Sequence, residues 1–165
     1  KVEMVITGES DFFASSEKDA DFFWVYYAWD VIAAQLRGIE LNYIDLAPIE
    51  PALDYYTPVI ATGEALIDEN PELIKRFMRA TAKGYQFAMD NPDEAASILL
   101  EYAPELDSEL VRASQNWLKD HYQADADKWG IQSKEVWENY ALWLLDNGLV
   151  DEMLDAEQAF TNDFI

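Results

Sequence analysis

The sequence of 165 residues contains no cysteine and a single histidine, His121. Without cysteine, these residues hold no disulfide bond, no thiolate metal site and no cysteine nucleophile. One histidine cannot form the paired ligands of a zinc site, and we interpret His121 as a core or boundary residue on the apolar side of an amphipathic helix. Nucleophile-elbow, dinucleotide-binding and P-loop motifs are also absent. We therefore expect no catalytic residue, no metal and no cofactor.

Positive charge is scarce. The chain has 11 Lys and Arg against 33 Asp and Glu, a formal net charge of −22. A phosphate backbone is repelled by such a surface, which makes nucleic acid a poor partner, and anionic lipid surfaces are disfavoured for the same reason. Most of the carboxylates are interpreted as solvated helix faces. A neutral or cationic small molecule remains compatible with this charge.

Long apolar runs are missing as well, and none approaches the roughly 20 residues that span a bilayer. No signal peptide is visible. Because the first residue is Lys1 rather than an initiator methionine, the missing signal says little about location.

Aromatic residues are abundant, with six Trp, nine Tyr and eight Phe. Such side chains bury large areas, which is typical of a globular domain rather than a disordered acidic tail. The densest stretch runs from Asp21 to Asp30, DFFWVYYAWD. Its continuous apolar part predicts a strand that is covered on both faces.

The first third of the chain predicts an α/β organisation. Apolar and β-branched runs predict strands over 2–8, 21–27 and 39–46, with a further extended stretch over 55–62. A helical turn is expected over 11–18, and a helix over 29–38 closed by Gly38. The loop over 47–53, which contains two prolines, is the expected boundary between a domain of residues 1–53 and a domain of residues 54–165.

From Gly63 onward, apolar residues at three- and four-residue spacing predict helices almost throughout. Their expected starting points are Asn70-Pro71, Asn91-Pro92, Asp107 or Ser108, Ser133 and Asp155. Gly148 is expected to close one of them. Aromatic residues at helical spacing are interpreted as core residues: Trp117, Trp137, Tyr140 and Trp143.

The stretch DADKWG over 125–130 has part of the pattern of a calcium loop. Trp129 occupies the fifth position, where a ligand is needed, and Val136 the twelfth, where a bidentate Glu is needed. We interpret the stretch as a turn between helices.

Two short segments are candidates for ligand contact. Trp29 and Asp30, with Tyr27, follow the strand predicted over 21–27, and ligands gather at the carboxyl ends of strands in open α/β sheets. Trp and a carboxylate at that place fit a planar heterocycle with amino groups. The second segment, Tyr55, Tyr56 and Thr57, lies beside the expected crossing between lobes. Core or hinge packing is the alternative for both segments.

Several long segments together cover nearly the whole chain: DFFWVYYAWDVIAAQLRGIELNYIDL, DYYTPVIATGEALIDENPELIKRFMRATAKGYQFAMDNPDEAASILLEYAPELD, LVRASQNWLKDHYQADADKWGIQ, and VWENYALWLLDNGLV with AFTNDFI. In the order and spacing of these segments the chain resembles the NMT1/THI5-like solute-binding proteins of ABC transporters, which bind thiamine-pyrimidine precursors. In this resemblance Trp29 and Asp30 match a Gly-Trp-acid pocket segment, although Ala28 replaces the glycine. Tyr55, Tyr56 and Thr57 match an aromatic segment on the hinge side.

The resemblance implies a periplasmic-binding-protein type II fold, with residues 1–53 in the second lobe and the helices of 54–165 returning to the first. It implies an extracytoplasmic protein, in the periplasm or lipid-anchored, that delivers formylaminopyrimidine or hydroxymethylpyrimidine to a membrane permease. Such proteins are about twice as long as this chain. We therefore expect a fragment that lacks the N-terminal half, with an exposed apolar surface or a swapped dimer.

Other functions remain open. A binding protein for another small solute, such as a sulfonate, has the same fold. Fungal relatives of the family are enzymes that make the pyrimidine from a histidine of their own and a cofactor. Because His121 is the only histidine and is expected on a helix, that enzymatic role is disfavoured.

Overall fold

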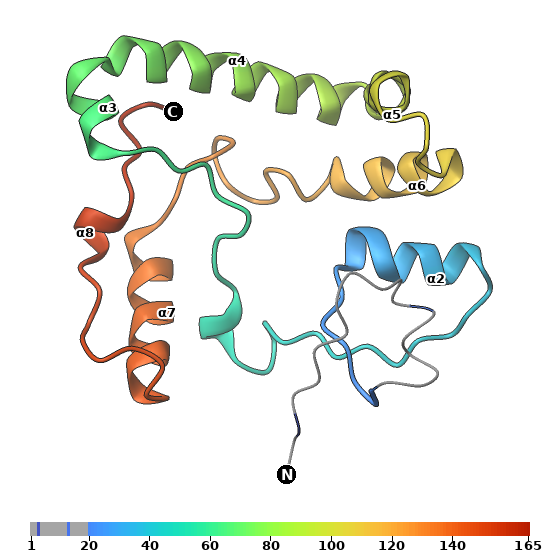
Figure 1. Ribbon diagram of the computed structural model, residues 1–165, viewed down its shortest axis with the longest axis horizontal. Coiled ribbons are helices and arrows are strands. Elements are labelled where there is room, and N and C mark those ends of the chain that lie inside the picture. The colour runs from blue at the N-terminus through green and yellow to red at the C-terminus, as the bar shows by residue number, and fades with distance from the viewer. Residues whose placement is uncertain (1–2, 4–12, 14–19) are drawn as a thin grey trace. The chain divides into compact units, whose positions relative to one another are not determined.

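The computed structural model describes residues 3, 13 and 20–165, which form two compact units (Figure 1). The first unit comprises Lys1–Leu41 and Pro92–Leu118, and the second comprises Asn42–Asn91 and Lys119–Ile165. The strand expected over 2–8 and the helical turn expected over 11–18 fall almost entirely outside the described residues. The proposed domain boundary at residue 53 stays a prediction.

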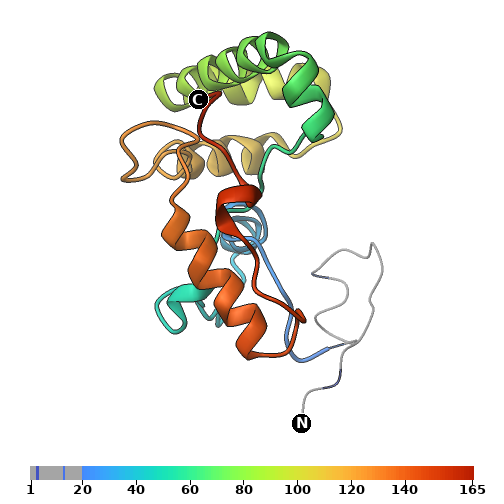
Figure 2. The same ribbon diagram turned by 90° about the vertical axis from the view of Figure 1, so that its left-hand side faces the viewer.

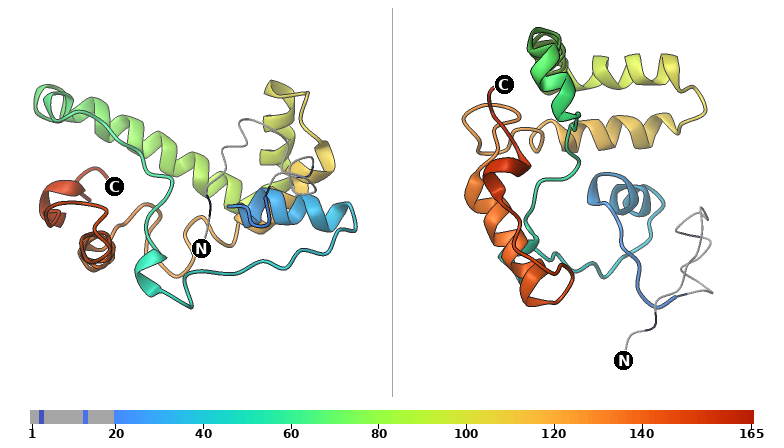
Figure 3. Two further views of the ribbon diagram at one scale, coloured as in Figure 1. Left: turned by 60° about the horizontal axis from the view of Figure 1, so that its bottom comes forward. Right: turned by 60° about the vertical axis from the view of Figure 1, so that its left-hand side comes forward.

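The described part of the first unit from residue 20 onward contains four helical segments. A π-helical turn, η1 (Tyr27–Val31), continues directly into α2 (Ile32–Leu36), and α5 (Pro92–Tyr102) is followed by α6 (Ser108–Leu118). Helix α6 packs against α5, α2 and η1, and α5 and α6 lie side by side in the right-hand view of Figure 3. Small and β-branched side chains allow this close approach and are buried between the helices: Val31, Ala34, Ala96 and Val111.

Polar contacts also join α5 to α6. The guanidinium group of Arg112 donates to the Asp93 carbonyl oxygen at 3.2 Å and to the Ser97 hydroxyl at 3.1 Å. The side-chain amide of Asn116 donates to the Asp93 carboxylate at 3.1 Å. Since Arg112 and Asn116 are four residues apart, they lie on the same face of α6 and hold the first turns of α5.

The second unit contains η2 (Pro51–Leu53), α3 (Glu64–Glu69), α4 (Pro71–Asp90), α7 (Lys134–Asp146) and α8 (Ala156–Ala159). Helix α7 contacts both η2 and α8, and α8 lies alongside it in Figure 2. An aromatic cluster holds the loop after residue 119 on α4. The Tyr85 ring stacks on Trp129 with centroids 4.4 Å apart, and it meets the ring of Tyr122 at an interplanar angle of 81°.

The expected helix starts are confirmed. Asn70 caps α4 by accepting from the Leu73 N–H at 3.2 Å, and Asp155 caps α8 by accepting from the Glu157 N–H at 3.0 Å. Between the two alternatives for α6, Asp107 is the cap, because its carboxylate accepts from the backbone N–H groups of Glu109 and Leu110, both at 2.9 Å. Ser133 precedes α7 but makes no side-chain capping bond.

Two glycines close helices as expected. Gly38 has φ +68°, and the Ile39 N–H donates to the Ala34 carbonyl at 2.9 Å. Gly148 has φ +66°, and the Leu149 N–H donates to the Leu144 carbonyl at 2.9 Å. Both ends are Schellman motifs, which require the left-handed backbone that glycine adopts without strain.

The strands expected over 21–27, 39–46 and 55–62 are not formed in the described part of the chain. A lone extended segment has no ladder partner for its N–H and C=O groups, and none of the described residues pairs with these segments. The aromatic stretch nevertheless keeps the alternation of an extended chain. Phe22, Trp24 and Tyr26 are 81%, 67% and 65% exposed, whereas Phe23 and Val25 are half-buried.

The prediction for His121 was wrong in its placement. Helix α6 ends at Leu118, and His121 is an exposed residue in the turns that follow, not part of an apolar helix face. The DADKWG stretch lies in these turns, as expected, and ends at Gly130 with φ +82°. Among the described helices, none is long and apolar enough to cross a membrane.

Candidate ligand-binding site

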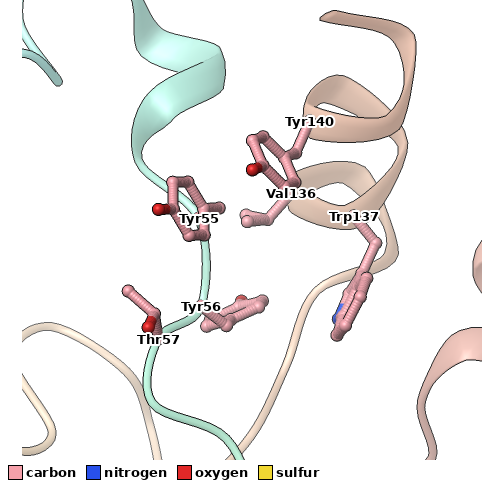
Figure 4. A pocket seen from close by; sticks show the side chains of 6 residues that line it. All are labelled: Tyr55, Tyr56, Thr57, Val136, Trp137 and Tyr140. Carbon is pink, nitrogen blue, oxygen red and sulfur yellow. The ribbon is translucent and has the colours of Figure 1, made fainter. Parts of the chain in front are cut away.

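A pocket of about 220 Å³ lies in the second unit, between the segment after η2 and one face of α7 (Figure 4). Three lining residues of α7 are spaced so that they share a helix face. The opposite wall is the consecutive segment that the sequence singles out. The lining residues are Tyr55, Tyr56 and Thr57 from this segment, and Val136, Trp137 and Tyr140 from α7.

The two walls are fastened to each other at two points. The ring of Tyr55 stacks on the ring of Tyr140, with centroids 4.2 Å apart and an interplanar angle of 15°. The hydroxyl oxygen of Tyr56 accepts a hydrogen bond from the Ser133 N–H at 2.7 Å. Because Ser133 immediately precedes α7, this bond ties the segment to the N-terminal end of the helix and satisfies the backbone N–H of Ser133. The segment is thereby fixed in register with the helix.

The lining residues carry no formal charge at neutral pH. Burial, followed by the neighbouring Tyr55 phenol, raises the pKa of Tyr140 above its ordinary value of 10.0, which keeps Tyr140 neutral. Lys134 begins α7, and its ammonium group pairs with Glu157 at 2.6 Å and Glu138 at 3.5 Å. The hydrogen bond to Glu157 is the main reason that the pKa of Lys134 is raised.

An uncharged wall of aromatic rings and hydroxyl groups suits a flat, neutral ligand. Aromatic faces stack on planar rings, and tyrosine and threonine hydroxyls both donate and accept hydrogen bonds. The volume of about 220 Å³ is below the roughly 300–1,000 Å³ of pockets for drug-sized ligands, which favours a molecule of one ring. In the described residues, no group of three or more His, Asp or Glu side chains is arranged to hold a metal ion.

The other predicted segment lies in the first unit, within η1. One carboxylate oxygen of Asp30 accepts from the Tyr26 N–H at 2.7 Å, which ties the acid to the start of its own turn. The Tyr27 ring stacks on Trp117, with centroids 5.0 Å apart. Trp29 is 37% exposed. The structure therefore brings Tyr55, Tyr56 and Thr57 together at one pocket, and Tyr27, Trp29 and Asp30 together on one helical turn.

Three pocket residues were missed from the sequence as site residues. Trp137 and Tyr140 were interpreted as core, and Val136 was not singled out as a ligand contact. Their spacing along α7 is a signal for a shared face, but it does not distinguish a face that meets a core from one that lines a cavity. Trp143, which belongs to the same predicted stripe, is half-buried and lies beside Tyr140, with ring centroids 6.4 Å apart.

Comparison with known proteins gives the family of the chain. The family model described as NMT1/THI5 like matches residues 1–95. The chain belongs to the NMT1/THI5-like family, whose members have a fold of the periplasmic-binding-protein kind.

Three curated relatives indicate the range of functions in this family. The chain is similar to a riboflavin-binding protein, RibY, of Chloroflexus aurantiacus, with 31% identity over 79% of the chain and 39% of the relative. It is also similar to a formylaminopyrimidine-binding protein of Halalkalibacterium halodurans, with 28% identity over 76% of the chain and 39% of the relative. A 4-amino-5-hydroxymethyl-2-methylpyrimidine phosphate synthase of Legionella pneumophila is 26% identical over 59% of the chain and 29% of its own length. The chain thus spans well under half of the length of each.

Proposed function

We propose that this chain forms part of an extracytoplasmic solute-binding protein of an ABC importer, and that its ligand is a thiamine pyrimidine precursor, formylaminopyrimidine or hydroxymethylpyrimidine. The observation that supports this most directly is the small uncharged aromatic pocket at Tyr55, Tyr56 and Thr57. The pocket matches a single neutral heterocycle in size and chemistry. Similarity to a formylaminopyrimidine-binding protein supports the same ligand class.

In this proposal the pyrimidine ring stacks against the aromatic wall, and the Thr57 and tyrosine hydroxyls bond its ring nitrogens. Within the first unit, Trp29 and Asp30, with Tyr27, are proposed as ligand-contacting residues in their own right. A carboxylate is a suitable acceptor for an exocyclic amino group, and only one oxygen of Asp30 is used by the Tyr26 N–H. The division into a second-lobe part and helices that return to the first lobe belongs to the same proposal.

The proposed partners are a membrane permease, which receives the ligand, and a further protein surface. The exposed row of Phe22, Trp24 and Tyr26 supports such a surface contact, because apolar side chains of this size are usually covered. A second copy of the chain, or another part of the same protein, is the proposed cover.

Titration calorimetry tests the ligand, using both this chain and the protein translated from the whole reading frame that contains it. Formylaminopyrimidine is expected to bind with a Kd of about 10 µM or tighter. Trp29→Ala is expected to weaken binding about tenfold or more, since stacking on an indole is lost. Trp24→Ala, a tryptophan of the same segment that is more exposed, is the matched control and is expected to bind like the wild type. No heat with either protein at tens of micromolar would refute the ligand assignment.

Riboflavin is the second candidate ligand, favoured by the relative with 31% identity. Its ring system has three fused rings, which makes the small pocket less suitable. Quenching of flavin fluorescence on addition of protein distinguishes the two ligands directly. A sulfonate is a third candidate, and the absence of charged lining residues argues against an anion in this pocket.

The enzymatic alternative is favoured only by the similarity to the Legionella synthase. A pyrimidine synthase that consumes its own histidine needs that residue at the ligand site. His121 is exposed in the turns after α6 and does not line the pocket. Mass spectrometry of the protein is expected to find no covalent or cofactor adduct, and His121→Ala is expected to leave ligand binding unchanged.

A further inference from the structure

The C-terminal segment holds the residue that precedes α7 by two hydrogen bonds from one side chain. The Asn162 amide oxygen accepts from the Gln132 N–H at 3.0 Å, and the Asn162 amide nitrogen donates to the Gln132 carbonyl at 2.9 Å. One asparagine thus satisfies both backbone groups of Gln132. An amide is the side chain that offers a donor and an acceptor side by side, so no isosteric side chain reproduces both bonds.

Gln132 in turn holds a wall of the pocket. Its side-chain oxygen accepts a hydrogen bond from the indole N–H of Trp137 at 2.8 Å. Phe160, which also belongs to the C-terminal segment, lies parallel to the indole at an interplanar angle of 2°, with centroids 5.9 Å apart. Trp137 lines the pocket and Phe160 does not. The indole is therefore held by Gln132 at its N–H edge and by Phe160 on one side, and its remaining surface is available to face the cavity.

We propose that Asn162 is a positioning residue of the ligand pocket: through Gln132 it sets the orientation of the Trp137 ring on which the ligand stacks. The proposal rests on the proposed function, since it assigns the stacking surface to Trp137. Stacking depends on the tilt and offset of the two rings, and a wall that is free to rotate loses that geometry. The C-terminal segment thereby contributes to affinity without touching the ligand.

Other contacts keep the C-terminal segment in place when Asn162 is altered. Lys134 pairs with Glu157 at 2.6 Å, and the side chain of Ile165 lies over Gly130. A substitution at Asn162 is therefore expected to free the Gln132–Trp137 contact rather than to detach the segment. This separates a positioning role from a general loss of fold.

The first test reads the indole N–H of Trp137 by NMR, with the six tryptophans labelled with ¹⁵N and Trp137→Phe identifying the signal. Asn162→Ala and Gln132→Met are expected to shift that signal and to speed its hydrogen exchange about tenfold, because the indole hydrogen bond is weakened or lost. Gln132→Glu keeps an acceptor oxygen and is expected to keep the slow exchange. Thr161→Ala, which removes only the bond from the Asp163 N–H, is the matched control.

The second test measures formylaminopyrimidine binding by the same variants. Asn162→Ala and Gln132→Met are expected to raise Kd about three- to tenfold, with Gln132→Glu and Thr161→Ala close to the wild type. Gln132→Met keeps the backbone bonds of Asn162 and tests the link from Gln132 to Trp137. If Asn162→Ala does not fold, Asn162→Asp takes its place, because it keeps the acceptor for the Gln132 N–H and loses the donor to the Gln132 carbonyl.

Three results separate failure of this proposal from failure of the proposed function. An indole signal that is unchanged in the Asn162 variant overturns this proposal, and so does a shifted signal with an unchanged Kd. If the wild type binds no pyrimidine while the indole signal responds as expected, the proposed function has failed and the orientation of Trp137 by Asn162 stands.

Discussion

The ring of Tyr55 lies on the ring of Tyr140, with centroids 4.2 Å apart, and this stack joins two segments that are far apart in the sequence. Tyr140→Ala is expected to lower the free energy of unfolding by about 1–3 kcal/mol, because a half-buried ring and its stacking partner are lost. Tyr140→Phe keeps the ring and is expected to change it by less than about 0.5 kcal/mol. Urea denaturation followed by circular dichroism measures both, and equal losses in the two variants would contradict the role of the stack.

The same residue gives a pH dependence. Burial and Tyr55 raise the pKa of Tyr140 in the folded protein above its ordinary value of 10.0, so the folded state holds the phenol proton more tightly than the unfolded state. This contribution to stability is fully present below pH 10.0 and is lost as pH rises through the folded pKa. Above that pH the wild type is therefore expected to lose unfolding free energy relative to Tyr140→Phe, which has no phenol to ionise at this position. A difference that stays constant from pH 8 to 11 would contradict it.

Helix caps differ in strength, and the structure ranks them. Asp107→Ala removes two hydrogen bonds to backbone N–H groups and is expected to lower stability by about 1 kcal/mol or more. Ser133→Ala removes no capping bond, so its effect is expected to stay below about 0.5 kcal/mol. Thermal unfolding of the two variants in parallel checks the ranking, and the reverse order would show that Asp107 does not cap α6.

Two glycines are expected to respond in opposite directions to the same substitution. Gly148→Ala puts a Cβ on a residue with φ +66° and is expected to destabilise by about 1 kcal/mol. Gly84 lies within α4, and a Cβ there meets no atom within 4 Å. Gly84→Ala is therefore expected to stabilise by about 0.5–1 kcal/mol. Denaturation midpoints measure both.

The exposed row of Phe22, Trp24 and Tyr26 predicts a surface that binds other apolar surfaces. The chain is expected either to bind the dye ANS under native conditions or to form a dimer that covers Phe22, Trp24 and Tyr26. Changing these three residues to serine is expected to reduce whichever signal is present. Light scattering with dye fluorescence decides the matter, since a compact monomer that binds no dye would contradict the expectation.

Local signals in the sequence predicted the helices well. Helix-capping and helix-closing residues contact only neighbours within a few positions, so the local sequence is enough to predict where a helix begins or ends. Examples are Asn70 with Pro71, Asp107, Gly38 and Gly148. Strands depend on partners elsewhere in the chain or beyond it. The aromatic stretch from Phe22 keeps its alternation, but no described segment completes its ladder.

Only one wall of the pocket could be predicted from the sequence, because the other wall is brought to it by long-range contacts. Tyr55, Tyr56 and Thr57 are conspicuous as a cluster, whereas Trp137 and Tyr140 look like any aromatic helix stripe. These segments are paired by the Tyr55–Tyr140 stack and by the Tyr56–Ser133 hydrogen bond, which joins residues 77 apart in the sequence. Contacts of such long range leave no local pattern in the sequence.

Helix α4 is bounded at both ends by the same dipeptide, Asn70-Pro71 before it and Asn91-Pro92 after it. Each proline disfavours the helical conformation of the asparagine before it, so α4 cannot extend at either end. Its length is therefore fixed at about 30 Å for its 20 residues. A single inserted residue lengthens α4 by about 1.5 Å and rotates the residues after it by about 100° about the helix axis. Insertions and deletions within α4 are therefore expected to be tolerated only in steps close to whole helical turns.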